Sequence, residues 1–422
     1  MIRRTLIGLM IAMVFLAGNA RADKILIPMD DSQTDHLKAY GVAYWCLQQG
    51  MKVEWLLNFR AGSFLADARG NIENICLLRG VDYEVVSQDQ VSRIEAIIDS
   101  ENMEIVELEK VPNVAVYTPP NKEPWDDAVT LALTYAEILY ETVWDEDVLA
   151  GKLVEYDWLH LHHEDFTGQY GKFYAMYHSA TWYQQEVAVN EMTARKLGFS
   201  KVPDLKLAVA RTIRDYISRG GFLFAMCSAP ETLDMGLAAW NTDIVPQEYD
   251  GDPYDPNCKE KLDYDQCLCF ENFTPSLNAL EYRHSDIDTY PERRAYIPGA
   301  NADYFSLFDF SAKLDPVPTM LVQCHVGTMN GFMGQSTAMR KSLLKKFVTV
   351  LAEVEGKDEA RYVHGNFGKG TFTFLSGHDP EDYQHMIGDP PTDLSLYKNS
   401  PGYRLILNNI LFPAARQKER KT

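Results

Sequence analysis

The string HLHHED, residues 160–165, contains three histidines and two acids within six residues. The residues before it predict a strand over 155–163, and His160 and His162 would point the same way because side chains alternate along a strand. Two imidazoles on one face offer two nitrogen ligands to a divalent metal. We therefore predict His160 and His162 as metal ligands.

The tip of the same predicted strand carries the remaining polar side chains. His163, Glu164 and Asp165 would face a pocket there, so we predict that they bind substrate together with His162. The alternative is that one imidazole is hydrogen-bonded in the core while the others line a polar rim. Two histidines elsewhere are candidates for a third metal ligand: His325, which is also predicted to contact substrate, and His378.

Cys227 ends another predicted strand, residues 219–227, and precedes a predicted helix. At such a corner the N–H groups and dipole of the helix favour a thiolate and can stabilise an oxyanion. We predict Cys227 as a nucleophile. The alternative is a buried core cysteine, since free cysteine is among the most buried residue types.

His378 follows the last predicted strand and has acids close behind it. A histidine oriented by a carboxylate can serve as the base for a thiol. We predict His378 as the base, Glu381 as its orienting acid and Asp379 as a substrate contact.

Residues 1–22 have the pattern of a signal peptide. Arg3 and Arg4 precede an apolar run, and Ala20-Arg21-Ala22 forms an A-x-A cleavage site. The mature protein would begin near Asp23 and be periplasmic or secreted. No later segment is apolar for long enough to span a bilayer.

The charge balance excludes one class of partner. The net charge is −20, and removal of residues 1–22 takes away three arginines and no acid, giving −23. Nucleic-acid binding needs clustered Lys and Arg, so the expected partner is a small-molecule substrate. No cofactor is predicted apart from the divalent metal.

Short apolar runs that alternate with amphipathic stretches predict an α/β fold with a mostly parallel sheet flanked by helices. We expect one domain over residues 23–415, which begins with a β-α-β unit and ends in a late antiparallel meander. Long insertions are expected at about 60–110 and 243–318, and residues 416–422 read as a basic tail. The predicted strands are 24–29, 52–59, 114–119, 155–163, 219–227 and 319–326, and a helix is predicted to begin at Pro124.

The chain has seven cysteines, an odd number. In an oxidising compartment at least one would stay unpaired or pair between chains, and Cys227 is the one we expect to be free. We predict a disulfide from Cys258 to either Cys267 or Cys269.

Two of these segments together carry a resemblance to a known superfamily. RGGFLFAMC (219–227), followed far downstream by GKGTFTFLSGHDPEDYQH (368–385), resembles the class I glutamine amidotransferase-like superfamily, and most of all its trehalose-utilisation-like branch. The resemblance implies a flavodoxin-like fold and a triad of Cys227, His378 and Glu381. Ala225 and Ala229 stand where that superfamily has glycines around the cysteine.

The chain also resembles exported bacterial proteins labelled asparagine synthetase B, through phrases such as HLHHEDFTGQYGKF and SPGYRLILNNILFPAA. The chemistry of that label needs a cysteine directly after the initiator Met and an SGGxDS loop for ATP. Ile2 follows Met1, and no such loop is in the sequence. ATP-dependent amide synthesis is therefore not expected.

Three functions stay open at this point. The first is a Cys-His hydrolase acting on a small amide or carbohydrate-derived molecule. The second is a hydrolase that uses a metal held by His160, His162 and a third histidine. The third is a non-catalytic binding protein of the same fold.

Overall fold

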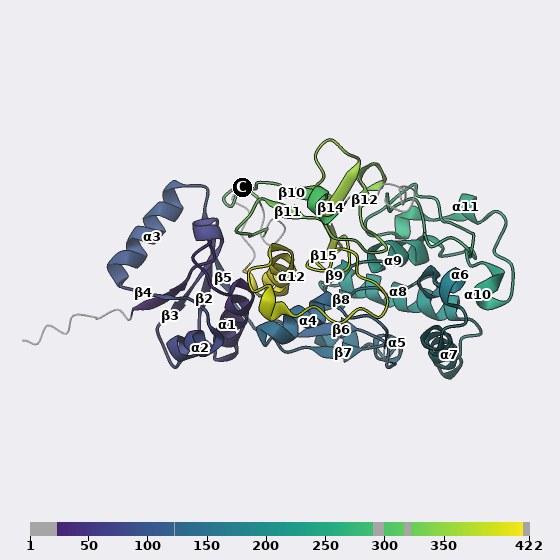
Figure 1. Ribbon diagram of the computed structural model, residues 1–422, viewed down its shortest axis with the longest axis horizontal. Coiled ribbons are helices and arrows are strands. Elements are labelled where there is room, and N and C mark those ends of the chain that lie inside the picture. The colour runs from purple at the N-terminus through teal and green to yellow at the C-terminus, as the bar shows by residue number, and fades with distance from the viewer. Residues whose placement is uncertain (1–22, 122, 290–298, 316–321, 417–422) are drawn as a thin grey trace, which may run out of the picture.

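The computed structural model describes residues 23–121, 123–289, 299–315 and 322–416. The predicted signal peptide and most of the predicted tail lie outside these residues. The described chain is an α/β protein with two separate sheets, one of five strands and one of ten (Figure 1). The larger sheet is mixed, with a parallel core, so the prediction of a mostly parallel sheet is confirmed only for that core.

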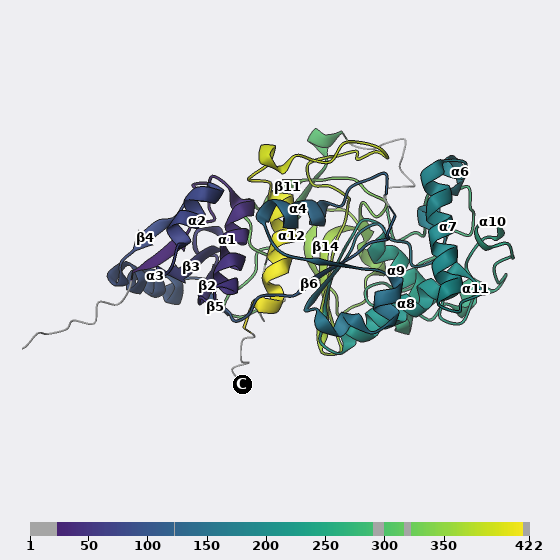
Figure 2. The same cartoon turned by 90° about the horizontal axis from the view of Figure 1, so that it is seen from below.

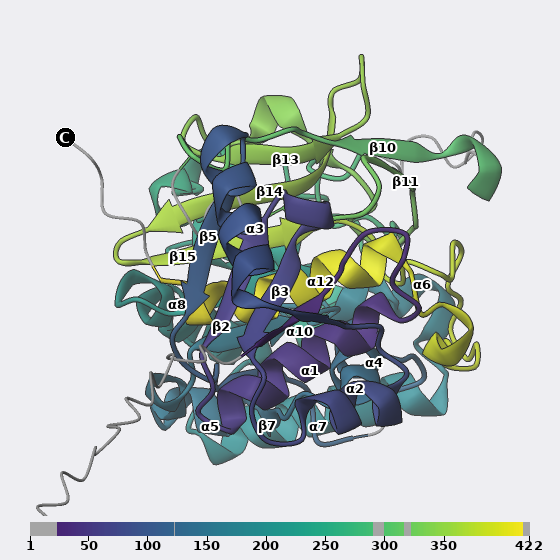
Figure 3. The same ribbon diagram turned by 90° about the vertical axis from the view of Figure 1, so that its left-hand side faces the viewer.

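The smaller sheet lies at the N-terminal end and is antiparallel throughout. Figure 3 views the molecule from the side on which this sheet lies. The strands of the smaller sheet, in spatial order, are β4 (Glu84–Val86), β1 (Lys24–Ile27), β3 (Ser63–Asp67), β2 (Val53–Leu57) and β5 (Glu104–Leu108). The predicted β-α-β unit is present as β1, α1 and β2, but its two strands are not neighbours, because β3 pairs with both of them and lies between them. Residues 60–110, predicted as an insertion, supply three of these five strands.

The larger sheet contains five parallel strands and continues with antiparallel ones. The parallel strands, in spatial order, are β7 (Glu141–Val143), β6 (Val114–Tyr117), β8 (Trp158–Leu161), β9 (Phe222–Met226) and β15 (Gly370–Leu375). The antiparallel strands are β14 (Glu359–Phe367), β13 (Thr349–Glu353), β10 (Tyr304–Leu307) and β11 (Thr328–Asn330), with β12 (Met339–Arg340) paired to β14. Strands β13, β14 and β15 form the predicted late meander.

The order of the parallel strands decides where a ligand would bind. Numbered along the chain, they run 2-1-3-4-5 across the sheet. In a doubly wound sheet of this order, the connections leave in opposite directions from the first and third strands, which opens a crevice beyond their carboxyl ends. Here those strands are β6 and β8.

Three helices fill the space between the two sheets, as Figures 1 and 2 show. They are α1 (His36–Gln48), α4 (Ala128–Ala136) and α12 (Pro401–Leu411). Helices α1 and α4 approach so closely that a Cβ on Gly41 would lie 1.8 Å from the carbonyl oxygen of Ala136. One apolar core therefore runs from the smaller sheet through these helices to the larger one.

The remaining helices pack beside α1, on the outer faces of the two sheets or along the long connections. They are α2 (Ile72–Arg79), α3 (Gln88–Ser100), α5 (Asp145–Leu149), α6 (Tyr174–Tyr177), α7 (Thr181–Lys196), α8 (Val202–Ser218), α9 (Ala229–Ala238), α10 (Gln247–Asp250) and α11 (Cys258–Lys261). None of the described helices is long and apolar enough to cross a membrane.

Two local predictions fail in the described residues. The helix expected from Pro124 begins at Ala128, because the Asp127 side chain caps it by accepting the N–H groups of Val129 and Thr130. Of the strand predicted at 319–326, residues 322–326 are irregular, and the rest lies outside the described residues.

The predicted disulfide is also wrong, since all seven cysteines are free. The loop that contains Cys267 and Cys269 is held by a carboxylate instead. Asp234 is fully buried and accepts the backbone N–H groups of Leu268, Cys269 and Phe270 at 2.6–2.8 Å.

Candidate active site at the carboxyl ends of the parallel strands

Four of the parallel strands deliver polar side chains to one edge of the sheet. The loop after β6 carries an acidic segment, residues 123–127, while β8 runs into His162 and His163. Cys227 directly follows β9, and His378 lies just beyond β15. The side chains meet because parallel strands all end at the same edge.

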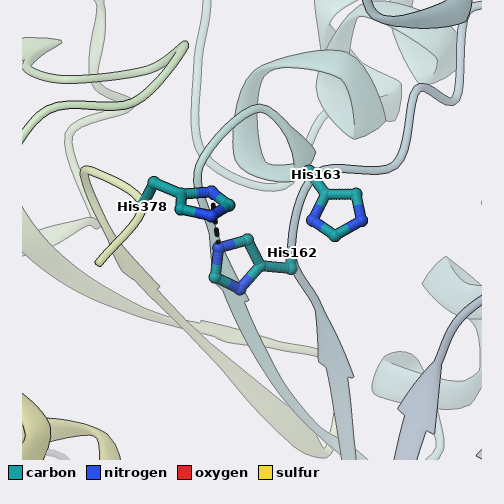
Figure 4. A group of neighbouring side chains, drawn as sticks. All are labelled: His162, His163 and His378. Carbon is teal, nitrogen blue, oxygen red and sulfur yellow. Dashed lines mark hydrogen bonds between the residues drawn. The ribbon is translucent and has the colours of Figure 1, made fainter. Parts of the chain in front are cut away.

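Three imidazoles converge at this edge. Nε2 of His162 lies 3.1 Å from Nδ1 of His378, and the ring of His163 lies beside them (Figure 4). One nitrogen from each ring lies within 4.8 Å of the other two. Three histidine nitrogens at such separations can ligate one divalent ion.

Each of these rings also has a carboxylate next to its other nitrogen. The three pairs are His162 Nδ1 with Asp127 Oδ1 at 3.5 Å, His163 Nε2 with Glu123 Oε2 at 2.7 Å and His378 Nε2 with Asp126 Oδ1 at 3.8 Å. All three acids come from the five residues 123–127. A carboxylate behind each histidine is the usual outer shell of a metal site, where it fixes the tautomer and raises the basicity of the ligand.

This arrangement leaves ring nitrogens facing one another. Nδ1 of His162 and Nε2 of His378 lie beside carboxylates but form no hydrogen bond with them, at 3.5 and 3.8 Å. Nε2 of His162 and Nδ1 of His378, 3.1 Å apart, can share one hydrogen or hold one metal ion between them. Nδ1 of His163 is also buried and has no hydrogen-bond partner.

Burial keeps two of the rings in the neutral form that binds metals. It lowers the pKa of His162 to about 4 and that of His378 to about 3. Burial also disfavours the charged form of His163, but Glu123 outweighs it and raises the pKa of His163 to about 9. Without a metal ion, the cluster therefore holds one cationic and two neutral imidazoles at neutral pH, and His163 would release its proton on binding a metal.

Asp127 links the helix to the histidines. The carboxylate that caps α4 also lies 3.3 Å from Nε2 of His160, whose Nδ1 is 3.1 Å from the carbonyl oxygen of Phe224. Burial opposes ionisation of Asp127, yet His160 and His162 hold its pKa well below the usual range. His160 therefore lies behind His162 and orients the same acid.

His385 extends the cluster toward solvent. Its ring stacks on His378 with centroids 4.3 Å apart, and its Nε2 lies 3.2 Å from Asp126. Its Nδ1 lies 3.0 Å from Asp382, whose side chain is 32% exposed. The pair provides a connected path of polar groups from the site to the surface.

Cys227 adopts a backbone conformation that is rare for a side chain other than glycine, with φ of 51°. Its N–H donates to the carbonyl oxygen of Gly377 at 3.1 Å. Burial raises the pKa of the thiol to about 12. Among the described residues, no imidazole forms a hydrogen bond with this thiol, so the thiol and His378 share a cavity without forming a bonded pair.

The acids predicted at the tip of β8 organise the backbone. Glu164 accepts the N–H of His162 at 2.8 Å, and burial raises its pKa to about 7. Asp165 accepts the N–H and hydroxyl of Thr167 and the N–H of Gly171, and it pairs with His284 at 3.3 Å. Both side chains shape the loop that follows the strand.

The acids near His378 lie apart from its ring. Asp379 is fully buried, accepts the N–H of Glu381 at 2.8 Å and bonds the hydroxyl of Thr392 at 2.7 Å. Glu381 is partly buried, and its pKa is raised by that burial. The carboxylate beside the His378 ring is Asp126 rather than Glu381.

His325 lies in a different part of the molecule. Its ring stacks on His36 of α1 at 4.2 Å, and its Nδ1 lies 3.2 Å from Nη1 of Arg404 in α12. The structure therefore brings His162, His163, His378 and Cys227 together but leaves His325 out.

A cavity of about 450 Å³ opens onto this cluster. Its lining includes His163, Cys227, His378 and His385, together with a set of aromatic and methionine side chains. A pocket of this size, with a few convergent polar groups in an apolar wall, is typical of a site for small molecules.

Sequence reasoning missed four members of the cluster: Glu123, Asp126, Asp127 and His385. Asp126 and Asp127 fall in the first turn of the helix predicted from Pro124, where they would only offset its dipole, and Glu123 precedes that helix. One signal was present: Asp before an apolar periodic run is a preferred N-cap, which would place residues 123–126 in the preceding loop. His385 had no comparable signal.

No protein-family profile and no curated protein matches the chain. Two solved structures from Salmonella typhimurium resemble it distantly. Cytoplasmic protein STM3548 has 10% identity and a TM-score of 0.36, and cytoplasmic protein STM1381 from strain LT2 has 11% identity and a TM-score of 0.33. Each alignment covers 72% of this chain and 99% of the other.

Proposed function

We propose that this protein is a metal-dependent hydrolase of small amides or esters, with His162, His163 and His378 as the metal ligands. One observation carries the proposal: three imidazoles converge, and each has its own carboxylate on the opposite nitrogen. Histidines buried for packing alone do not need three acids from one short segment behind them.

The donor set suits zinc or a similar first-row divalent ion. Held by these three nitrogen ligands, such an ion would lower the pKa of a bound water to about 7 and would polarise a carbonyl group. Glu123, Asp126 and Asp127 would orient the ligands. His385 lines the cavity beside Asp126, where it can accept a proton and pass it toward Asp382.

The strand order supports a finer assignment of the fold. The order 2-1-3-4-5 is that of flavodoxin-like sheets, which is consistent with the class I glutamine amidotransferase-like resemblance of residues 219–227 and 368–385. We also propose that the mature chain begins near Asp23 and works in the periplasm or outside the cell, with a small molecule rather than a nucleic acid as its partner.

The test is hydrolysis of p-nitrophenyl acetate and of acyl p-nitroanilides by the mature protein. We expect activity that dipicolinate removes and that Zn²⁺, Mn²⁺ or Co²⁺ restores. His162→Ala should lose it, whereas His178→Ala, which removes an exposed histidine outside the cluster, should keep it. Full activity in protein that has been stripped of metal would contradict the proposal.

A thiol hydrolase is the second candidate, and the backbone of Cys227 favours it. A non-glycine residue at φ 51° between a strand and a helix is costly, and such costs concentrate at functional sites. Cys227→Ala distinguishes the two candidates, with Cys324→Ala as the matched control. Loss of activity with unchanged metal content would favour the thiol, whereas retained activity favours the metal.

A further inference from the structure

The cavity beside the histidine cluster has an aromatic wall. Trp125, Phe173, Tyr177 and Tyr282 line it, and Trp182 packs behind them. Trp125 and Phe173 are stacked at 5.4 Å, and Phe173 contacts Tyr177 and Tyr282 at 5.9 and 5.6 Å. These mutual contacts hold the rings in place before any ligand arrives.

This wall reaches the histidine cluster itself. The indole ring of Trp125 meets the ring of His163 edge-on, with centroids 5.1 Å apart. Its Nε1–H is buried without a hydrogen-bond partner. A ligand whose reacting carbonyl lies at the histidines would therefore find a flat apolar surface next to it.

The rest of the apolar lining is flexible and extends to the surface. Met176, Met333, Met386 and Ile387 contribute to it. Met176 is 55% and Met386 61% exposed, so they border the opening. Methionine side chains adapt to ligands of varied shape, and their exposure at the mouth favours an apolar group that extends outward.

The polar lining is too sparse for a sugar or a phosphate ester. Besides the histidines, Cys227 and the two tyrosines, the polar or acidic residues of the lining are Asp288, Gln335, Thr337 and Gln384, and no described residue of the lining is Lys or Arg. The Gln335 amide is already engaged, donating to the carbonyl oxygen of Gly171 at 2.5 Å. Within the described lining, an anionic group far from the histidines would meet no cationic side chain, and a sugar would leave most of its hydroxyls unpaired.

We infer that the natural substrate is a neutral amide or ester whose acyl part carries a flat apolar ring, which lies against Trp125 and Phe173. This inference rests on the proposed metal site and names the substrate class of that site. The carbonyl group would lie at the histidines, the ring along the aromatic wall, and any extension of the ring between Met176 and Met386.

Three hydroxamates that share one metal-binding group test this inference: acetohydroxamate, 2-naphthohydroxamate and gluconohydroxamate. Binding to the mature, zinc-loaded protein is measured by calorimetry. We expect 2-naphthohydroxamate to bind about 30-fold more tightly than acetohydroxamate, from the apolar area that its ring buries. Gluconohydroxamate should bind no more tightly than acetohydroxamate.

Variants test whether the naphthyl ring extends toward the opening of the cavity. Met386→Glu places a charge at the opening and should weaken naphthohydroxamate binding at least fivefold, while acetohydroxamate changes less than twofold. Met192→Glu, at an equally exposed methionine on α7, is the matched control and should change neither.

The outcomes separate this inference from the function on which it rests. Equal binding of the acetyl and naphthyl probes to zinc-loaded protein would overturn the inference and leave the metal site standing. Tighter binding of gluconohydroxamate would overturn it in favour of a carbohydrate. Failure to load zinc, together with no binding of any probe, would overturn both proposals.

Discussion

The molecule contains two groups of buried or half-buried histidines that differ in what surrounds them. His36 and His325 stack between the two sheets, and their hydrogen bonds end on an amide, on backbone carbonyls and on the guanidinium of Arg404. His162, His163 and His378 instead have carboxylates on their outer nitrogens, and their other nitrogens face one another.

The difference shows how partners decide what a buried histidine can do. A fixed cation beside His325 repels a metal ion, and the hydrogen bonds of His36 leave neither of its nitrogens available. Acids behind the other cluster attract a cation and make the ligands more basic. We therefore call the first group the structural pair and the second the site cluster.

The largest expected effect is loss of the metal from the site cluster. His162→Ala or His378→Ala should weaken zinc binding by more than about 1,000-fold, since loss of an outer partner alone costs about 10–100-fold. His325→Gln, in the structural pair, should leave zinc affinity unchanged because its ring lies elsewhere. Competition with a fluorescent zinc chelator measures both, and similar losses in all three variants would erase the distinction.

The next effect concerns the structural pair and folding stability. Arg404 is fully buried and bonds the carbonyl oxygens of Met29 and Ala61, the hydroxyl of Tyr40 and the ring of His325. Arg404→Met should lower the free energy of unfolding by about 3 kcal/mol, because several buried acceptors lose their donor.

Urea unfolding measures this loss, and Arg195→Met on the exposed face of α7 is the control, with a change below about 0.5 kcal/mol. Zinc affinity of the folded Arg404→Met protein should be unchanged. A large fall in zinc affinity would show that the two histidine groups are coupled.

A smaller effect on zinc affinity is expected when the carboxylate of Asp127 is replaced by an amide. Asp127→Asn keeps a good N-cap for α4 but removes the charge behind His162, so zinc affinity should fall about 10–100-fold with little loss of stability. Asp35→Asn makes the same exchange at the N-cap of α1, next to His36, and should not change zinc affinity. Equal effects of the two exchanges would contradict the role given to Asp127.

The smallest effect is a pH dependence of stability. Burial, with His36 and Arg404 nearby, lowers the pKa of His325 to about 3. The folded state therefore resists a proton that the unfolded state binds at about 6.5, so stability is present above pH 6.5 and is lost as the pH falls toward 3. Between pH 7 and 5, wild type should lose about 1 kcal/mol more than His325→Gln, after discounting for partial exposure. An identical loss in both proteins would contradict this assignment.

Sequence periodicity located the parallel core because its strands are short, apolar and buried. The ends of β8, β9 and β15 were placed within a few residues, so His162, Cys227 and His378 could be expected at one edge. The smaller sheet was not predicted in its observed form, because pairing depends on contacts between distant residues. Nothing local to β1 or β2 indicates that β3 lies between them.

The site was predicted in the same uneven way. The histidines stand out by type and spacing, whereas Asp126 and Asp127 look like ordinary helix-starting acids. Their role depends on where the loop after β6 turns, and the capping of α4 by Asp127 decides that. His325 was grouped with the site because it follows an apolar run, yet that run forms no strand in the described residues.

Anomalous diffraction from a crystal of the mature protein, grown with zinc, tests the central claim most directly. The account predicts one strong peak about 2 Å from a ring nitrogen of each of His162, His163 and His378, and no peak at the structural pair. No peak between these three rings, in crystals that contain zinc elsewhere, would contradict it.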